Sequence, residues 1–245
     1  HAVDILISFV RFVRRHRRLP RAINLWNNHI FRFKASGVLS SPIRRLVSDK
    51  ETVKDHIAKQ LGAGYTVPTL AVLRTPDDLA NFEFPANCCI KSTHASGHVI
   101  LRQNNEPLDY GKMVGWFFYD HYLRGREANY RGLPAKIIVE PLVFDGAEFS
   151  EVRFYCVNGK VRGIWLETGR FVDKNSALYD LDFNHIYQWV GEATDFAATR
   201  PEKLDEMIAA ATTLAAPFSF IRVDMFTDGR RYLVGELTSC DGNAM

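Results

Sequence analysis

The chain of 245 residues is 47% hydrophobic and 24% charged, which is typical of a globular protein with one large domain or two small ones. No apolar run approaches the roughly 20 residues of a membrane span. The formal net charge of +3 is unevenly placed, because residues 1–50 hold eleven Lys or Arg residues against two acids and the remainder is acidic.

The cysteines indicate a reduced, cytoplasmic chain. Cys88 and Cys89 are adjacent and would point to opposite faces of a strand, which disfavours a disulfide between them. Cys156 and Cys240 complete the set, and no Cys-x-x-Cys motif occurs. The apolar residues 2–10 precede the basic run, the reverse of the order in a signal peptide. We therefore expect buried thiols and a cytoplasmic location.

Residues 4–20 have the spacing of an amphipathic helix, which Pro20 limits. Its second half and the residues just beyond are rich in arginine: Arg11, Arg14, Arg15, Arg17, Arg18 and Arg21. Such a helix can lie on an anionic membrane surface, which would place the protein peripherally on the inner face of the membrane. Nucleic acid, a protein partner or packing on the rest of the fold are the alternatives. A second short helix is predicted over residues 22–33.

Residues 48–85 are predicted to form a helix, a strand and a short helix. Ser48 or Asp49 can cap the next helix, Glu51 is spaced from Ser48 as in a capping box, and the helix stops at Gly62. A strand over residues 66–73 is interrupted by Pro68, and a short helix begins near residue 77.

A lysine leads into a small polar loop between two strands predicted at 88–91 and 98–102. The loop 92–97 follows Lys91 and contains one glycine. Backbone N–H groups of such a loop can close on phosphate oxygens while the lysine supplies positive charge. An ordinary hairpin with an exposed lysine is the alternative. A further alternative is a metal site built from Cys88, Cys89, His94 and His98, although buried structural cysteines are commoner.

The middle of the chain is predicted to form a helix and then strands. The helix over residues 110–123 is rich in aromatic side chains, which we assign to the core rather than to a base-stacking platform. A buried strand over 135–143 carries one acid, Glu140, near its end. Strands over 151–157 and 161–167 flank Asn158-Gly159, a two-residue hairpin signal. Residues 168–196 are expected to form a long irregular loop.

The last two strands carry one acid each. After an amphipathic helix that begins near residue 201, strands over 220–226 and 232–237 are joined at Asp228-Gly229. Asp224 and Glu236 then lie on facing strands among apolar residues, where a carboxylate needs a partner or a cation. Mg²⁺ prefers carboxylates, waters and substrate phosphates, so we expect both acids to bind it. The alternative pairs Asp224 with Arg222 and Glu236 with Arg231.

These motifs, in this order, resemble the ATP-grasp fold, and more narrowly the TupA-like branch of ATP-grasp amidoligases of polysaccharide and teichuronopeptide biosynthesis. The resemblance runs from about Ser48 to the C-terminus. It rests on Ser-Asp-Lys (48–50), Ile-Lys-Ser-Thr-His-Ala-Ser-Gly (90–97), Arg-Phe-Tyr-Cys-Val-Asn-Gly-Lys (153–160), Asp-Leu-Asp-Phe-Asn-His (180–185), Phe-Ile-Arg-Val-Asp (220–224) and Gly-Glu-Leu-Thr (235–238).

The fold that the resemblance implies is α+β, with two subdomains whose antiparallel sheets clasp ATP. Residues 48–139 would form the first subdomain with the phosphate loop, and residues 140–245 the second with the magnesium site. Residues 1–47 would form a basic helical segment ahead of them.

The resemblance also implies a nucleotide site. Its phosphate contacts would come from Lys50 and Lys91 and from the loop residues Ser92, His94, Ser96 and Gly97. Its adenine contacts would come from Glu140 and the backbone of Leu142 or Val143, and its ribose contacts from Glu148 or Glu151.

The implied chemistry has two steps, in which a substrate carboxylate attacks the γ-phosphate of ATP and an amine then displaces phosphate to leave an amide. Asp224 and Glu236 would hold Mg²⁺. Arg222 and Lys91 would act in catalysis, Arg222 by stabilising the acyl phosphate.

One motif departs from the family pattern. Many ATP-grasp enzymes carry Glu-x-Asn at the metal, whereas this chain carries Glu236-Leu237-Thr238. Thr is a poorer ligand than Asn, and Asp241 or Asn243 would have to replace it.

The expected function is therefore an ATP-dependent, Mg²⁺-dependent ligase that joins a small-molecule or saccharide carboxylate to an amine, for example a uronic acid of a surface or capsular polysaccharide to an amino acid. A phosphoryl- or glycosyl-transferring enzyme on the same fold is the first alternative. A non-catalytic module that binds nucleotide and docks on a membrane is the second. No nucleic-acid partner is expected.

Overall fold

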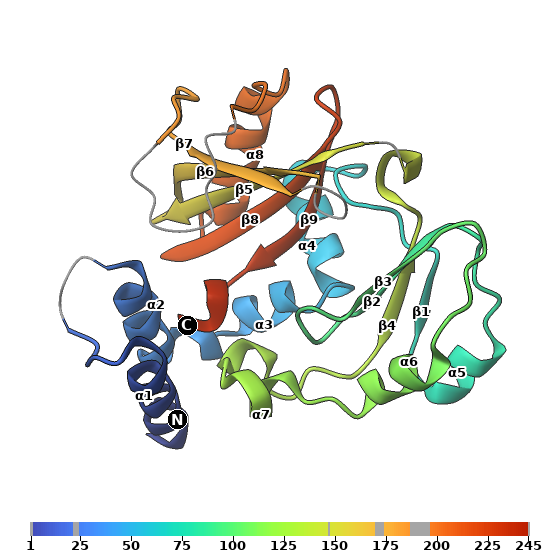
Figure 1. The fold of residues 1–245 in the computed structure, drawn as a ribbon, viewed down its shortest axis with the longest axis horizontal. Helices are drawn as coiled ribbons and strands as arrows, with labels where there is room; N and C mark the ends of the chain where they lie inside the picture. The colour runs from blue at the N-terminus through green and yellow to red at the C-terminus, as the bar shows by residue number, and fades with distance from the viewer. Residues whose placement is uncertain (1, 22–24, 147, 170–173, 187–196, 245) are drawn as a thin grey trace.

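The computed structural model describes residues 2–21, 25–146, 148–169, 174–186 and 197–244. Two antiparallel sheets form the body, one of four strands and one of five. The helices between residues 42 and 61 lie between the sheets (Figure 1). The predicted α+β class with two antiparallel sheets is confirmed.

The smaller sheet separates apolar from charged residues by strand alternation. Its strand order is β1 (Ala71–Leu73), β4 (Ile137–Glu140), β2 (Cys88–Ser92) and β3 (Val99–Arg102). One face, with Ile90 and Val139, packs against helices α5 (Pro76–Asn81) and α6 (Tyr110–Phe117). The opposite face carries Lys91 and Glu140, so packing of the apolar face presents both charges on the other side.

The larger sheet is divided in the same way. Its strand order is β7 (Asn175–Tyr179), β6 (Lys160–Thr168), β5 (Ser150–Val157), β8 (Phe220–Thr227) and β9 (Tyr232–Thr238). Phe154, Ile221 and Val223 belong to the core that this sheet forms with α8 (Leu204–Ala215). The predicted hairpin at Asn158-Gly159 is confirmed, with both residues at positive φ, as a tight two-residue turn requires.

Two helices lie between the sheets, and the first of them was not predicted from the sequence. Helix α3 (Pro42–Ser48) begins at a proline in its first turn and ends at Ser48, and α4 (Thr52–Leu61) follows. The predicted capping box is wrong, because Ser48 donates to the Arg44 carbonyl and Glu51 binds Arg74. Asp49, the other predicted cap, accepts from the backbone N–H groups of Glu51 at 2.8 Å and Thr52 at 3.4 Å, at the start of α4.

The N-terminal helices pack on the C-terminal end of the chain. Helices α1 (Ala2–His16) and α2 (Trp26–Ala35) and the short helix η1 (Val38–Ser40) share a core in which Phe12 and Ile30 meet Phe220 and Cys240. Figure 1 shows both termini at this end of the molecule, next to the short helix η4 (Asp241–Ala244). None of the helices in the described ranges is long and apolar enough to cross a membrane.

Several predicted elements differ in extent. The helix expected over 4–20 ends at His16, and the strand expected over 135–143 spans only 137–140. The helix expected over 110–123 is two helices, α6 and α7 (His121–Gly125), because the Asp120 side chain caps a new helix by accepting from the Leu123 N–H at 2.9 Å. The strand expected over 66–73 spans only 71–73, since Pro68 cannot donate to a ladder. The loop expected over 168–196 includes β7; its residues 170–173 and 187–196 lie outside the described part.

Two further short helices complete the body, η2 (Ala128–Tyr130) and η3 (Val143–Gly146). All four cysteines are buried and none forms a disulfide, as predicted.

Candidate active site

Asp224 and Glu236 lie directly opposite each other on β8 and β9, on the face of the larger sheet that points away from α8. The Asp224 side chain is almost fully buried, at 3% exposed, whereas the Glu236 side chain is 40% exposed. One carboxylate is therefore fixed by the protein while the other opens to solvent and to ligands.

Arg222 binds the two acids from one side. Its guanidinium donates to both oxygens of Asp224, at 2.7 and 2.6 Å, and lies 3.7 Å from Oε1 of Glu236. It also pairs with Asp241. The predicted Arg222–Asp224 pair is thus present, but Arg231 pairs with Asp228 instead of Glu236.

The two opposed acids have divergent pKa values. Burial raises the pKa of Asp224 to about 7, because Arg222 offsets this effect only in part and Glu236 adds to it. Burial also acts to raise the pKa of Glu236, but Lys50 and Arg222 outweigh it and lower this pKa to about 2. At neutral pH Glu236 is therefore ionised and Asp224 is ionised in part, so the pair carries between one and two negative charges. A bound divalent cation would favour full ionisation of Asp224.

A second charged cluster lies beside the first on the same face of the sheet. Arg153 stands opposite Asp224 in the β5–β8 register and donates to Glu151 at 2.9 Å. Nη2 of Arg153 lies 3.4 Å from Oε2 of Glu167. Both Glu151 and Glu167 are buried. The sheet face is therefore a continuous row of charged groups rather than an isolated pair of acids.

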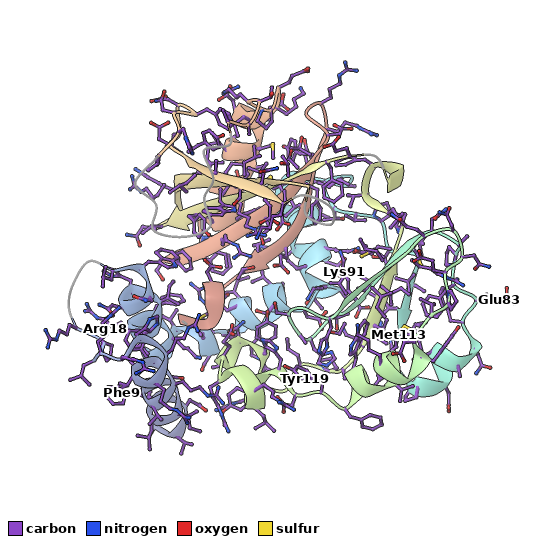
Figure 2. All side chains as sticks on the ribbon, in the orientation of Figure 1. Phe9, Arg18, Glu83, Lys91, Met113 and Tyr119 are labelled. Carbon is purple, nitrogen blue, oxygen red and sulfur yellow. The ribbon has the colours of Figure 1, made fainter. Side chains whose placement is uncertain are left out.

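The smaller sheet contributes a buried acid between two lysines. Glu140 accepts from Lys91 at 2.7 Å and also pairs with Lys54 of α4. Burial disfavours the Glu140 carboxylate, but Lys91 and Lys54 outweigh it and lower its pKa. Burial likewise disfavours the Lys91 ammonium, but Glu140 raises its pKa. Figure 2 labels Lys91 beside α4, in the space between the two sheets.

Lys50 lies between the loop 92–97 and the acids of the other sheet. Its backbone N–H donates to Thr93 O at 3.1 Å and its Nζ donates to Ala95 O at 2.6 Å. Burial lowers the pKa of Lys50, while Glu236 acts to raise it. Glu236 also raises the pKa of Lys91, so both lysines lie within electrostatic reach of the acid pair.

The loop 92–97 has a buried base and an exposed tip. Ser92 and His94 are buried, and Nε2 of His94 lies 3.1 Å from the Tyr119 carbonyl oxygen. Ser96 and Gly97 are exposed, and Gly97 has a φ of +80°, which favours glycine. The predicted contacts of these four residues with phosphates remain predictions.

The predicted hinge residues lie apart from the charged row, whereas one of the two acids predicted for the ribose belongs to it. Leu142 and Val143 line a cavity of about 540 Å³ that also contacts Tyr65 and the β8–β9 turn. That cavity includes none of the lysines or acids assigned to the phosphates and the metal. Of the two acids predicted for the ribose, Glu148 is exposed and Glu151 is buried in its pair with Arg153.

The carboxylate pair fits Mg²⁺ better than zinc. Two acids held face to face, one of them open to solvent, suit a cation that completes its shell with waters and phosphates. Within the described ranges no three His, Cys, Asp or Glu side chains form a group that could hold a metal ion, which leaves the alternative site of Cys88, Cys89, His94 and His98 without support and gives the acid pair no third ligand of these types.

The residues proposed to replace the missing Asn ligand differ in their surroundings. Thr238 donates to Glu236 at 3.1 Å and so positions this acid. Asp241 is held by Arg222 and accepts from the Tyr155 hydroxyl at 3.2 Å. The side chain of Asn243 lies outside the described part.

Sequence reasoning missed Lys54, Arg153 and Glu167. Lys54 lies in the first turn of α4, four residues after Lys50, which precedes the helix. Arg153 and Glu151 alternate with apolar residues in β5, so the period-two pattern placed them on the polar face but gave no partner. Nothing in the sequence indicated that Glu167 lies near Arg153, because this contact depends on the register between β5 and β6.

This chain is similar to several solved structures at low sequence identity. The D-alanine–D-alanine ligase of Helicobacter pylori is 15% identical with a TM-score of 0.46, over 81% of this chain and 53% of that one. The enzyme of the same name from Bacillus anthracis, complexed with ATP, is 15% identical with a TM-score of 0.41, over 80% and 55%. N5-carboxyaminoimidazole synthase from Aspergillus clavatus, in complex with ADP and an aminoimidazole ribonucleotide, is 14% identical with a TM-score of 0.44, over 82% and 46%.

The chain thus spans about half of the length of these structures. A search of the curated proteins gave no match. The family model described as TupA-like ATPgrasp matches residues 39–245, which include both sheets and every charged residue of the site. The chain therefore belongs to the TupA-like ATP-grasp family.

Proposed function

We propose that the chain binds ATP and catalyses the joining of a carboxylate to an amine. The observation that carries the proposal is the placement of Asp224 and Glu236, opposite each other and bound by Arg222, within electrostatic reach of Lys50 and Lys91. A triphosphate bound between the sheets would face cations on one side and an acid pair on the other.

The cations have separate tasks in this proposal. Lys50 and Lys91 bind the phosphate oxygens, and their present partners, a carbonyl and a carboxylate, hold them in place until the nucleotide arrives. Asp224 and Glu236 hold Mg²⁺, which neutralises charge on the phosphates when bound. Arg222 lies beside the acids and stabilises the charge of the acyl phosphate.

The proposed reaction forms an amide. A carboxylate oxygen of the acid substrate attacks the γ-phosphorus, and the bond from that phosphorus to the β–γ bridging oxygen breaks to release ADP. The amine nitrogen then attacks the acyl carbon, loses a proton, and expels phosphate. A role in polysaccharide biosynthesis is part of the proposal and comes from the resemblance of the sequence motifs, and a uronic acid with an amino acid is the substrate pair that we propose.

A matrix of ADP-release assays tests this function. Uronic acids and amino acids are combined pairwise with ATP and Mg²⁺, and each is also supplied alone. The proposal expects one pair for which steady ADP release needs both compounds. Release with a saccharide hydroxyl alone would instead identify a transferring enzyme. ATP binding without ADP release under any combination would identify a binding module and contradict the proposal.

A further inference from the structure

Helix α1 exposes an apolar row on the side that faces away from the protein. Val3, Leu6 and Val10 follow each other at intervals of three and four and are 61%, 62% and 45% exposed. Residues at these intervals share one face of a helix. Exposure of a contiguous row of aliphatic side chains to water is unfavourable, so this face of α1 is a candidate binding surface.

The opposite face of α1 is already anchored, which fixes the direction of the row. Phe12 is buried against the second helix, with its ring 5.2 Å from that of Phe31. Asp4 accepts from the Tyr122 hydroxyl at 2.7 Å and from Arg131 at 2.9 Å. The sole acid of α1 is therefore turned inward.

Positive charge continues the apolar row toward the end of the helix. Arg14 lies on the same face as Leu6 and Val10 and is exposed, and Arg17, just beyond the end of the helix, is exposed as well. Arg11 donates to the backbone carbonyl of Arg124, which sets α7 beside α1. Arg124 is itself exposed, so the neighbouring helix adds charge of the same sign.

We infer that this face of α1 docks on an anionic membrane surface. The aliphatic row would enter the boundary between headgroups and acyl chains, while the arginines bind the lipid phosphates. A nucleic acid would use the arginines but leave Val3, Leu6 and Val10 in water. Charge complementarity and the apolar row together therefore favour a lipid surface.

Docking in this orientation leaves the space between the sheets free. Figure 1 shows α1 at the end of the molecule, away from the smaller sheet. Figure 2 labels Phe9 and Arg18 at that end and Lys91 well away from them. The inference rests on α1 alone and does not depend on the proposed reaction.

Vesicle flotation tests the inference with the full chain. Vesicles of phosphatidylcholine with phosphatidylglycerol are compared with vesicles of phosphatidylcholine alone. The protein is expected to float with the anionic vesicles, and the double variant Leu6→Glu, Val10→Glu should lose about tenfold or more of this binding. Leu70→Glu is the matched control, since Leu70 is 49% exposed on the body of the protein, and it should float like the parent.

A second double variant and its control measure the contribution of the arginines to membrane binding separately from that of the apolar row. Arg14→Gln, Arg17→Gln should weaken flotation, most of all at low salt, whereas Arg162→Gln on the exposed face of β6 should not. Equal flotation of the parent and the Leu6, Val10 variant overturns the inference, as does absence of flotation. If the parent forms a dimer and the Leu6, Val10 variant is a monomer, the apolar row binds a second copy of the chain. That result would also overturn the inference. ADP release in solution should be unchanged in all these variants, which keeps this test separate from that of the reaction.

Discussion

Gly235 separates Val234 from Glu236 in a β-bulge that brings Glu236 opposite Asp224. Asp224 pairs with Glu236, but the next residue, Met225, pairs with Val234, so Gly235 is the extra residue of the strand. A bulge re-aims the side chains next to it. The acid pair of the site therefore depends on this local irregularity as well as on the two acids themselves.

A methyl group at Gly235 should disturb the site. A Cβ at this position would lie 2.6 Å from Cε2 of Phe226, so Gly235→Ala must displace the ring or the strand. We expect a loss of about 1–3 kcal/mol of unfolding free energy, together with lower activity. Gly115→Ala is the control, because a Cβ there meets nothing within 4 Å and the residue is helical. Urea unfolding of both variants checks this; equal stability of the two would contradict it.

Asp224→Asn should abolish turnover while the fold survives. The amide keeps the shape of the buried side chain but removes the charge that would hold the cation. We expect the rate of ADP release to fall by about a hundredfold or more, with circular dichroism unchanged. Asp228→Asn, in the β8–β9 turn, is the matched control and should keep full activity. Normal Mg²⁺-dependent turnover of the Asp224 variant would refute the metal assignment.

The stability of the protein without Mg²⁺ should depend on the titration of Asp224. Its pKa is raised from 3.8 to about 7, so its contribution to stability is full below about pH 4 and is lost as the pH rises toward 7. Glu236 is already ionised throughout the upper part of this range, since its pKa is about 2. Between pH 5 and 8 in EDTA, the parent should therefore lose more stability than Asp224→Asn.

Mg²⁺ competes with the proton at this site. Added Mg²⁺ should stabilise the parent more at pH 8 than at pH 5, and should not stabilise the variant at either pH. Urea midpoints at the two pH values measure both effects. Parallel pH profiles of parent and variant would show that Asp224 does not titrate in this range.

Lys91→Met should weaken nucleotide binding and the fold together. The change leaves buried Glu140 with Lys54 as its remaining cation, which we expect to cost about 1–3 kcal/mol, less than the full loss of a buried pair. The affinity for ATP should fall by about tenfold or more. Lys160→Met, at an exposed position on β6, is the control for loss of a lysine. Calorimetric titration with ATP that gives equal affinities for parent and Lys91 variant would exclude a phosphate role.

The acid pair could be predicted from sequence because its geometry is local. The turn at Asp228-Gly229 fixes the register of the two strands as far as Met225 and Val234, and the bulge at Gly235, one residue further on, then brings Glu236 opposite Asp224. A turn signal likewise found the hairpin at Asn158-Gly159, and an apolar run found the strand expected over 135–143, which spans 137–140.

The missing parts depend on contacts between distant segments. Nothing near Glu140 in the sequence indicates Lys54, which reaches it only because α4 lies beside the smaller sheet. Strand β7 lies in a polar stretch, and its pairing with β6 selects the extended form. The division of residues 110–123 into two helices follows from the cap at Asp120, which was hidden within a continuous aromatic pattern.

Transfer of an isotope from substrate to phosphate is the most direct test of the proposed reaction. The acid substrate that the ADP assays identify is labelled with ¹⁸O in its carboxylate and incubated with the amine, ATP and Mg²⁺. The two-step reaction predicts one ¹⁸O atom in each released phosphate, because the carboxylate oxygen that attacks phosphorus leaves with it. Amide formation with unlabelled phosphate, or a stable phosphorylated product, would contradict the acyl phosphate and with it the assignment of the chain as a carboxylate–amine ligase.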